Sequence, residues 1–573
     1  MVYFKVDRFA GIAPGVNPRT LSDQFGQIAK NIELDSGTIK GSKTVGSVEH
    51  TAQADSKSIY LYEYGVGNEV WLEWAEADVS VAEGPIPGDT TDRLYWTGEG
   101  YPRIGWVTTI TGQSAPYPTA SYALGVPAAD LAPTVVVTGA ENGEFTPSDV
   151  SYVYTLVTTD GREGPPSPAS GATPMREGQT ATIGIPSPNF ASGNHYFGSG
   201  ALKRIYRSNT GSNSTQFQLC KTVPYATVST TDTKAAYELQ ELLPSSDWIG
   251  PPDDDSSLYP DGPLQSLIPL AQGVMAGFTG KRFCLSVPFL PHAWPISYRI
   301  TTDESIVAIA GTNNGVIALT EAKPYFITGT DPSAMTAITV DLAQACINKN
   351  SVVDMGEYVL YAGPDGLCQV QGASGSVVTT GLISVDQWHA DFNPTTYKAF
   401  LYEGKYVAFS GADSWIYDPS GAEKTLTSFS SSQVYGAFYN TKAGELYPLY
   451  EDSGRKIKEF RGGSERETAV FKSKKFVAAS PVSMGWLSVE AGEYPVTVKV
   501  WADDTLIVNY ELTKSSDTYT QVTTTPANIS DGTLREPIMR MPAVIGQVWE
   551  IQVEGKDVYS VCLAQSMAEV KAT

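Results

Sequence analysis

The sequence predicts an all-β protein, and three observations carry this prediction. Glycine (53) and proline (37) are frequent among the 573 residues, so turns interrupt the chain at short intervals. Tyrosine alone contributes 31 residues, and aromatic residues suit the half-buried surface of a pleated sheet. Apolar residues recur in short alternating runs between turn residues, which is typical of strands. Long helices are therefore excluded.

Residues 1–125 are expected to hold an extended lead-in followed by the first blade or blades of a β-propeller. Turn residues stand at almost every second position of 12–19, and one short strand is expected at 27–34. Four strand-like runs then follow within 58–96, which is the size of one propeller blade. Residues 108–133, rich in Pro, Ala and Gly, are expected to be a linker.

Residues 134–245 are expected to form a separate β-sandwich inserted between blades. Short alternating runs at 152–159, 181–185, 203–208 and 217–219 fit a domain of about seven strands. Their order resembles fibronectin type III modules, with a Tyr-x-Tyr pair at Tyr152 and Tyr154 and a Gly-x-x-Ser-Pro string from Gly164. No tryptophan stands on the expected early strand, so the sandwich is predicted without its exact topology.

Residues 256–466 are expected to supply the remaining propeller blades. Hairpin-like units begin at Asn314, Gly356, Glu403 and Ala443, with separations of 42, 47 and 40 residues. A period of 40 to 50 residues with four strands per unit is the sequence mark of a β-propeller. Residues 467–573 are expected to form a last β-rich domain, with strands at 495–504, 548–555 and 558–563.

The charge balance argues against a protein that grips nucleic acid. The formal net charge is −23, whereas phosphate binding depends on Lys and Arg. Residues 51–100 are the most acidic stretch, with ten acids against Lys57 and Arg93. An acidic surface would let a polyanion pass without sticking, although acidity can also serve solubility alone. The candidate functional residues are six of these acids: Glu63, Glu69, Glu73, Glu76, Asp78 and Glu83.

The sequence offers no catalytic, cofactor-binding or metal-binding motif. The closest string to a P-loop, beginning at Gly277, lacks the required spacing and hydroxyl. The five cysteines are widely spaced and the four histidines are scattered, so we expect buried thiols and no zinc site. Asp303-Glu304 and Asp503-Asp504 are interpreted as turns, and Trp294 beside Pro295 as a packed residue. We expect a non-enzymatic protein without cofactors, signal peptide or membrane span, folded in the cytoplasm.

A series of strings along nearly the whole chain resembles a family of tailed-phage virion proteins. The strings, in order, are residues 9–19 (FAGIAPGVNPR), 31–37 (NIELDSG), 93–102 (RLYWTGEGYP), 288–295 (PFLPHAWP), 324–332 (PYFITGTDP), 353–356 (VDMG), 361–367 (YAGPDGL), 386–388 (DQW) and 561–569 (VCLAQSMAE). The family is similar in architecture to the tail nozzle or hub proteins of short-tailed phages, which are β-propellers assembled as a ring below the portal and adaptor.

The resemblance implies a structural role in a phage tail, with no catalytic residues. It implies a ring, six-fold by the family pattern, that forms part of the DNA-ejection channel, contacts the adaptor, portal and other tail proteins, and lets genomic DNA pass without specific binding. The expected location is the virion, without a membrane anchor. Two alternatives stay open: a receptor-binding protein, with its binding aromatics on the 134–245 sandwich, or a glycan-degrading propeller of the tail tip.

Overall fold

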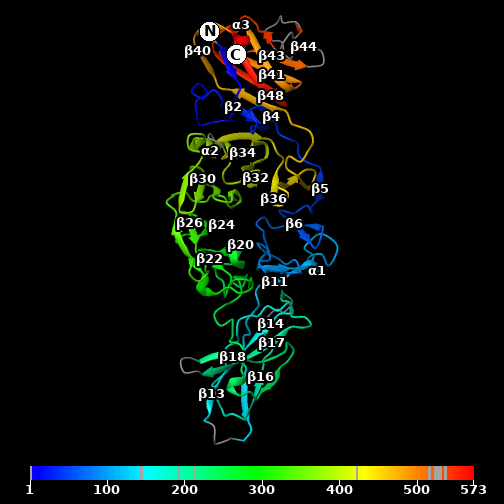
Figure 1. The fold of residues 1–573 in the computed structure, drawn as a ribbon, viewed down its shortest axis with the longest axis vertical. Helices are drawn as coiled ribbons and strands as arrows, with labels where there is room; N and C mark the ends of the chain where they lie inside the picture. Colours follow the sequence, from blue (N-terminus) through cyan, green and yellow to red (C-terminus); the bar gives the residue numbers. More distant parts are fainter. Residues whose placement is uncertain are drawn as a thin grey trace. The chain divides into compact units, whose positions relative to one another are not determined.

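The computed structural model describes residues 3–140, 146–189, 194–210, 215–420, 424–513, 518–521, 532–533 and 538–572. Nearly all regular structure in these ranges is β-strand (Figure 1). The α-helices described are α1 (Val107–Ile110), α2 (Val385–Asp391) and α3 (Met567–Ala572), none longer than seven residues. Among the described residues, no helix has the length and apolar character needed to cross a membrane. The all-β prediction is confirmed.

The chain divides into two compact units. The first comprises Met1–Leu61, Ala322–Pro324 and Val340–Thr573, and the second comprises Tyr62–Glu321 and Tyr325–Thr339.

The C-terminal part of the first unit is a β-domain around a large apolar core. Alternation on β42 places Val496, Val498 and Val500 inside, where they pack with residues such as Leu487 and Trp549. The ladders β41–β48 and β42–β47 are antiparallel. The strands are β39 (Ala469–Ser473), β40 (Phe476–Ser483), β41 (Trp486–Glu493), β42 (Val496–Ala502), β43 (Thr505–Thr513), β44 (Thr518–Gln521), β45 (Gly532–Thr533), β46 (Ile538–Arg540), β47 (Ile545–Gly555) and β48 (Asp557–Ala564).

The N-terminal segment belongs to this same domain. β1 (Tyr3–Val6) and β4 (Ile39–Gly41) pair with β48, β3 (Ile32–Glu33) pairs with β4, and β2 (Gly26–Lys30) pairs with β39. We expected residues 1–50 to be an extended lead-in grouped with the first blade. These strands instead complete sheets whose other members lie within residues 398–564, several hundred positions later in the sequence, a pairing that no local pattern encodes.

Three runs of four antiparallel strands follow one another in the first unit, and neighbouring runs share apolar clusters; the middle run, residues 398–429, is one end of a twelve-stranded sheet. The last of them is completed by β5 (Val48–Thr51), which pairs with β38. Their other strands are β28 (Val353–Asp354), β29 (Val359–Gly363), β30 (Gly366–Gln371) and β31 (Ser374–Val377), then β32 (Lys398–Tyr402), β33 (Lys405–Phe409), β34 (Ser414–Asp418) and β35 (Thr425–Phe429), and finally β36 (Val434–Asn440), β37 (Glu445–Glu451) and β38 (Arg455–Lys458).

The second unit contains three further four-stranded antiparallel sheets, again packed in succession through shared apolar clusters. The two-stranded sheet of β6 (Ser58–Tyr64) and β7 (Asn68–Trp74) precedes them in the sequence. The strands of the three sheets are β8 (Ser80–Glu83), β9 (Leu94–Thr97), β10 (Arg103–Gly105) and β11 (Tyr122–Ala123), then β20 (Gln265–Pro269), β21 (Met275–Thr279), β22 (Arg282–Leu285) and β23 (Ile300–Thr301), and finally β24 (Ile306–Thr312), β25 (Gly315–Thr320), β26 (Tyr325–Thr328) and β27 (Thr336–Thr339).

The sequence period corresponds to a repeated position in these sheets. Asn314, Gly356, Glu403 and Ala443 each lie in the turn between the first and second strand of a run of four antiparallel strands. Glu403 has a φ of 49°, in the left-handed region that tight turns use. The spacing of the turns therefore reflects one four-stranded unit after another.

Residues 134–245 form three β-sheets, two of three strands and one of two, that share one apolar core, which Tyr154, Ile183 and Ile205 help to fill. Some residues of this range lie outside the described residues. The strands are β12 (Thr134–Thr138), β13 (Ser148–Val150), β14 (Tyr152–Val157), β15 (Thr173–Met175), β16 (Thr180–Gly184), β17 (Leu202–Thr210), β18 (Thr215–Pro224) and β19 (Ser229–Asp232).

The sandwich is joined to the β8–β11 sheet by buried polar and aromatic contacts. The Arg162 guanidinium donates to the carbonyl oxygens of Ala123 (2.9 Å) and Leu124 (2.6 Å) and pairs with Asp160 at 2.7 Å. Tyr196 packs against Trp106 and Tyr122, with ring centroids 5.0 and 4.7 Å away. Within the second unit, the sandwich and this sheet therefore share a polar and aromatic joint.

Candidate functional site

The six candidate acids lie on the strands and turns from β6 to β8. Glu63 stands on β6, Glu69 and Glu73 on β7, and Glu83 at the end of β8. The other two, Glu76 and Asp78, lie between β7 and β8. The structure therefore divides the six acids between the β6–β7 sheet, the following connection and the edge strand of the β8–β11 sheet.

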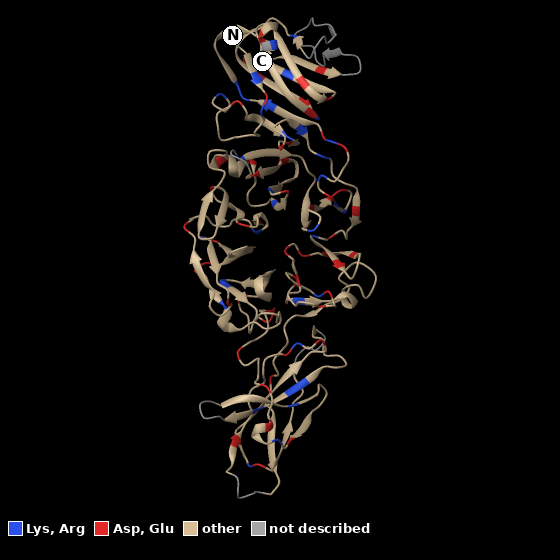
Figure 2. Cartoon of the chain, in the orientation of Figure 1, with Lys and Arg blue, Asp and Glu red and all other residues tan. Residues whose placement is uncertain are grey.

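The alternation of β7 explains how acids share a strand with core residues. Leu72 and Trp74 are buried on one face, while Glu69 and Glu73 lie on the opposite face because side chains alternate along a strand. Glu73 is half-buried, whereas the other five candidates are exposed. The carboxylates therefore sit on outer surfaces of a segment whose apolar side chains fix it in place. Figure 2 marks Asp and Glu positions in this part of the chain.

Other acids of the same stretch have local structural roles. The Asp92 carboxylate accepts from the Gly65 amide at 2.9 Å, and Glu99 lies 3.2 Å from the Arg103 guanidinium. Burial alone would raise the pKa of Asp89. Hydrogen bonds from Thr91, helped by the charge of Arg93, outweigh it and hold the pKa below its usual value. These acids fix turns and strand ends, which a count of charges cannot distinguish from a functional surface.

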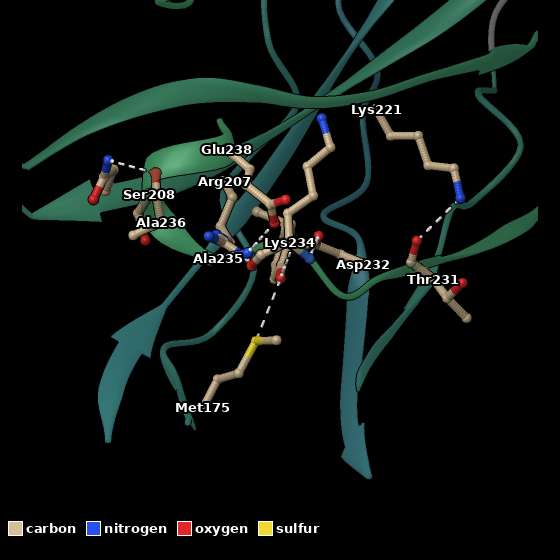
Figure 3. Close-up of polar contacts among 12 residues, drawn as sticks. Met175, Arg207, Ser208, Lys221, Thr231, Asp232, Lys234, Ala235, Ala236 and Glu238 are labelled. Atoms are coloured by element: carbon tan, nitrogen blue, oxygen red, sulfur yellow. Dashed lines mark hydrogen bonds and ion pairs between the residues drawn. The ribbon is translucent and has the colours of Figure 1, made fainter. Parts of the chain in front are cut away.

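A set of buried charged residues in the sandwich was not predicted from the sequence. Arg207 pairs with Asp232 at 2.8 Å, and the Tyr152 hydroxyl donates to the same carboxylate at 2.9 Å. Figure 3 shows Arg207 beside Asp232, with Lys221 reaching the Thr231 carbonyl. The available signal was a charged residue inside an apolar alternating run, as at Arg207 after Ile205 and Tyr206. Burial raises the pKa of the nearby Cys220 thiol to about 12, so that thiol stays protonated.

Other interpreted strings have packing roles in the structure. Trp294 is 1% exposed and donates its indole N–H to the Pro291 carbonyl at 2.7 Å. Asp503 and Asp504 form the β42–β43 turn with positive φ values, and Asp503 accepts the Val548 amide at 2.8 Å. All five cysteines are buried. Within the described residues, no group of three or more His, Cys, Asp or Glu side chains is arranged to hold a metal ion.

The arrangement from β6 to β8 can act through charge. Several carboxylates held on well-packed strands give a surface of fixed negative sign, which repels a phosphate backbone and attracts cations. Such a surface needs no precise geometry between its members, unlike an acid–base pair.

Comparison with known proteins gives no family assignment. No family model matches the chain, and no curated protein matches it. Among solved structures, the AfRom2 CNH domain aligns with 73% of this chain and 98% of its own, at 10% identity and a TM-score of 0.26. PorZ, a surface component of the type-IX secretion system of Porphyromonas gingivalis, aligns over 76% of this chain and 45% of its own, at 11% identity and a TM-score of 0.26.

The extracellular domain of BT4673, a putative one-component system from B. thetaiotaomicron, aligns over 86% of this chain and 46% of its own, at 9% identity and a TM-score of 0.21. The likeness at these scores is too low to carry an argument about function.

Proposed function

We propose that this chain is a structural, non-catalytic subunit of a phage tail that forms a ring around part of the DNA-ejection channel. The four-stranded sheets would be the blades of a β-propeller, with the fibronectin-III-like sandwich inserted between blades and the β-domain at the C-terminus. The ring, a homo-hexamer by the family pattern, would contact the adaptor or portal and other tail proteins. The protein would thus reside in the virion.

The observation that carries the proposal is the ordered series of strings, from residues 9–19 to 561–569, that resembles tail nozzle and hub proteins. Two structural features support it. The chain forms successive four-stranded antiparallel sheets, as propeller blades require. An N-terminal strand, β5, completes a sheet whose other strands come from residues 434–458, and blades of propellers are often completed in this way by strands from distant parts of the chain.

The acids on β6 to β8 give the proposal its physical mechanism. DNA that leaves a capsid slides past the channel wall, and any cationic site on the wall would hold its phosphates. Exposed carboxylates repel the backbone and remove such binding minima. Glu63, Glu69, Glu73, Glu76, Asp78 and Glu83 are the proposed wall residues, and closed rotational symmetry would repeat them around the ring.

The test combines imaging with ejection kinetics. Negative-stain microscopy of the purified protein and of particles that contain it should show a ring with a central opening; a protein that stays monomeric in both settings contradicts the proposal. The variant Glu69→Lys, Glu76→Lys and Glu83→Lys changes three exposed acids, so folding should be nearly unaffected. DNA ejection from particles with this variant should slow, and added salt should reduce the slowing because it screens phosphate contacts.

A matched control carries the same charge change on the sandwich. Asp149→Lys, Glu177→Lys and Glu241→Lys also replaces three exposed acids, but outside the proposed wall. Ejection should match wild type in this control. Equal kinetics for both variants at every ionic strength would remove β6 to β8 from the channel wall, and equal slowing of both would point to a general charge effect.

A further inference from the structure

A cavity lined by both polar and apolar side chains lies in the first unit, between the β36–β37–β38–β5 sheet and the segments that lead to and from the C-terminal domain. Its volume is about 260 Å³. Phe429 and Phe460 form apolar walls, and a run of serines from Ser430 to Ser432 follows one side. Ser42, Lys43 and Glu467 line it from two neighbouring segments, in which the Glu467 amide donates to the Ser42 carbonyl at 2.8 Å. The cavity is thus small, partly enclosed and built by segments distant in sequence.

The Arg461 side chain lines this cavity, and its buried guanidinium has few partners for its positive charge. Its side chain is 6% exposed, and its one ion pair is a 3.9 Å approach to Glu33. Among the described residues, no hydrogen bond from this guanidinium is present, although the group carries five N–H donors. Glu33 is already engaged, since its other carboxylate oxygen lies 2.8 Å from Arg466. Burial of a charged donor without hydrogen bonds is costly unless an acceptor completes the site.

Tyr450 adds a second buried donor to the same cavity. The residue is 3% exposed, and its hydroxyl has no hydrogen-bond partner among the described residues. Burial raises the pKa of Tyr450, so the hydroxyl keeps its proton and can donate. The guanidinium and the phenol lie near the Glu467 carboxylate in one small cavity, and neither makes a hydrogen bond within the described residues, which favours a ligand that brings oxygen acceptors.

The cavity is lined by three cations and three acids, and two of the acids are engaged by neighbouring cations. Asp452 is paired with Lys458, and Glu451 with Arg455 at 2.6 Å, so these acids are neutralised by neighbours. Burial raises the pKa of Glu467, although the nearby cations of Arg461 and Lys30 oppose the rise. Lys43 is exposed and lines the same cavity, where it adds a cation.

We propose that this cavity is a binding site for a small oxyanion, either a phosphate or a carboxylate. Arg461 binds the anion through its N–H fork, Tyr450 donates a hydrogen bond, and Lys43 contributes long-range attraction. The fork geometry of arginine matches both anions, since each offers two oxygens on one side. The volume suits an anion of a few heavy atoms rather than a nucleotide. The site is independent of the proposed channel wall.

Ligand-dependent stability of the full chain tests the site. Thermal unfolding is followed at pH 7 and constant ionic strength with sodium chloride, inorganic phosphate or acetate. Because a ligand that binds only the folded state stabilises it, the wild-type midpoint should rise by roughly 5 °C at saturating anion. A larger rise with phosphate than with acetate identifies a phosphate site, and the reverse identifies a carboxylate site. No rise with either anion overturns the proposal.

Three variants separate binding from structure. Arg461→Met removes the buried charge, so the midpoint in chloride should be at least that of wild type while the anion response disappears. Tyr450→Phe should fold normally and bind about tenfold more weakly by calorimetry, the loss of one hydrogen bond. The control Arg466→Met loses the contact with Glu33 and should lower the midpoint yet keep the anion response. An anion response that persists in Arg461→Met contradicts the site.

Discussion

The two β-domains outside the runs of four-stranded sheets handle charge in opposite ways. In the 134–245 sandwich, charged groups lie inside: Asp232 has a fully buried side chain, and Arg207 beside it is 5% exposed. In the C-terminal domain, valines, leucines and aromatic residues fill the core, and ion pairs such as Lys499 with Glu554 lie on a sheet face with about a quarter of each side chain exposed. Glu550 is an exception, since it is buried beneath Lys472 and Lys475.

This difference indicates which substitutions should destabilise each domain. An apolar core tolerates changes of surface charge, because exposed pairs contribute little. A buried ionic network depends on every partner, because each missing partner leaves a charge in a medium of low dielectric constant. In the sandwich, a single carboxylate, that of Glu163, accepts hydrogen bonds from the Thr155 and Tyr206 hydroxyls, both at 2.6 Å. The same carboxylate pairs with Arg204 at 2.9 Å. The sandwich should therefore respond more strongly than the C-terminal domain to single charge deletions.

The largest expected effect is that of Asp232→Ala. The change strands Arg207 in the interior and removes the acceptor of the Tyr152 hydroxyl, so the sandwich should lose about 3–5 kcal/mol of unfolding free energy. This loss is measured by urea unfolding of the full chain, with the unfolding monitored by hydrogen exchange in residues 152–157 and 202–208.

The double variant Asp232→Leu with Arg207→Met sharpens the result. Because it removes both charges, it should cost less than Asp232→Ala alone. If the double variant is the more damaging of the two, the network contributes through its shape rather than its charge, and the contrast between the domains fails.

A second expected effect is acid sensitivity of the sandwich joint. Burial lowers the pKa of His195 from 6.5 to about 4 and the pKa of His292 to about 3. The positive charge of Arg162 further disfavours protonation of both histidines, and the charge of Arg93 disfavours protonation of His292. Asp160 favours the protonated form of His292 but does not outweigh burial. The unfolded chain takes up protons below pH 6.5 while the folded joint does not, so stability is complete above 6.5 and falls toward pH 4.

The slope of this loss should reach about 1.4 kcal/mol per pH unit for each histidine. Unfolding of the second unit between pH 7 and 4.5 measures it, and His292→Gln should flatten the slope. The control is His389→Gln, in the first unit, which should leave this slope unchanged. The C-terminal domain has no histidine between 467 and 573, so it should lack this dependence; an equal slope in both regions would show that carboxylates cause it.

The smallest expected effect is that of Lys499→Ala on the C-terminal domain. Glu554 stays partly exposed to water when its partner is removed, so the loss should be below about 1 kcal/mol. Thermal unfolding at low and high salt measures it, and the difference between wild type and variant should shrink as salt rises. A loss comparable to that of Asp232→Ala would mean that the outer face is no less dependent on its ions than the sandwich interior.

Many strands could be predicted from the sequence because their signal is local. The predicted runs at 152–159, 203–208, 495–504 and 548–555 overlap β14, β17, β42 and β47, since alternation and turn residues lie within the same ten residues. The repeated turns at Asn314, Gly356, Glu403 and Ala443 were also visible, because a hairpin turn is set by its own residues.

The negative charge of the candidate site could be predicted from the sequence, but the arrangement of its carboxylates could not. Composition located the acidic stretch, yet it could not separate Glu69, on the outer face of β7, from Asp92, which fixes a turn through the Gly65 amide. That separation depends on which backbone groups approach each carboxylate.

By itself, the sequence determined the all-β class, the acidic stretch and the positions of many turns, because each follows from residue type and short-range spacing. Only the tertiary structure decided that β1 pairs with β48, that β5 completes the sheet of β36 to β38, and that Arg461 meets Tyr450 in one cavity. Pairing and burial of this kind join residues from 11 positions apart, as for Tyr450 and Arg461, to several hundred positions apart. They are set by which surfaces exclude water together, and no local pattern records that choice.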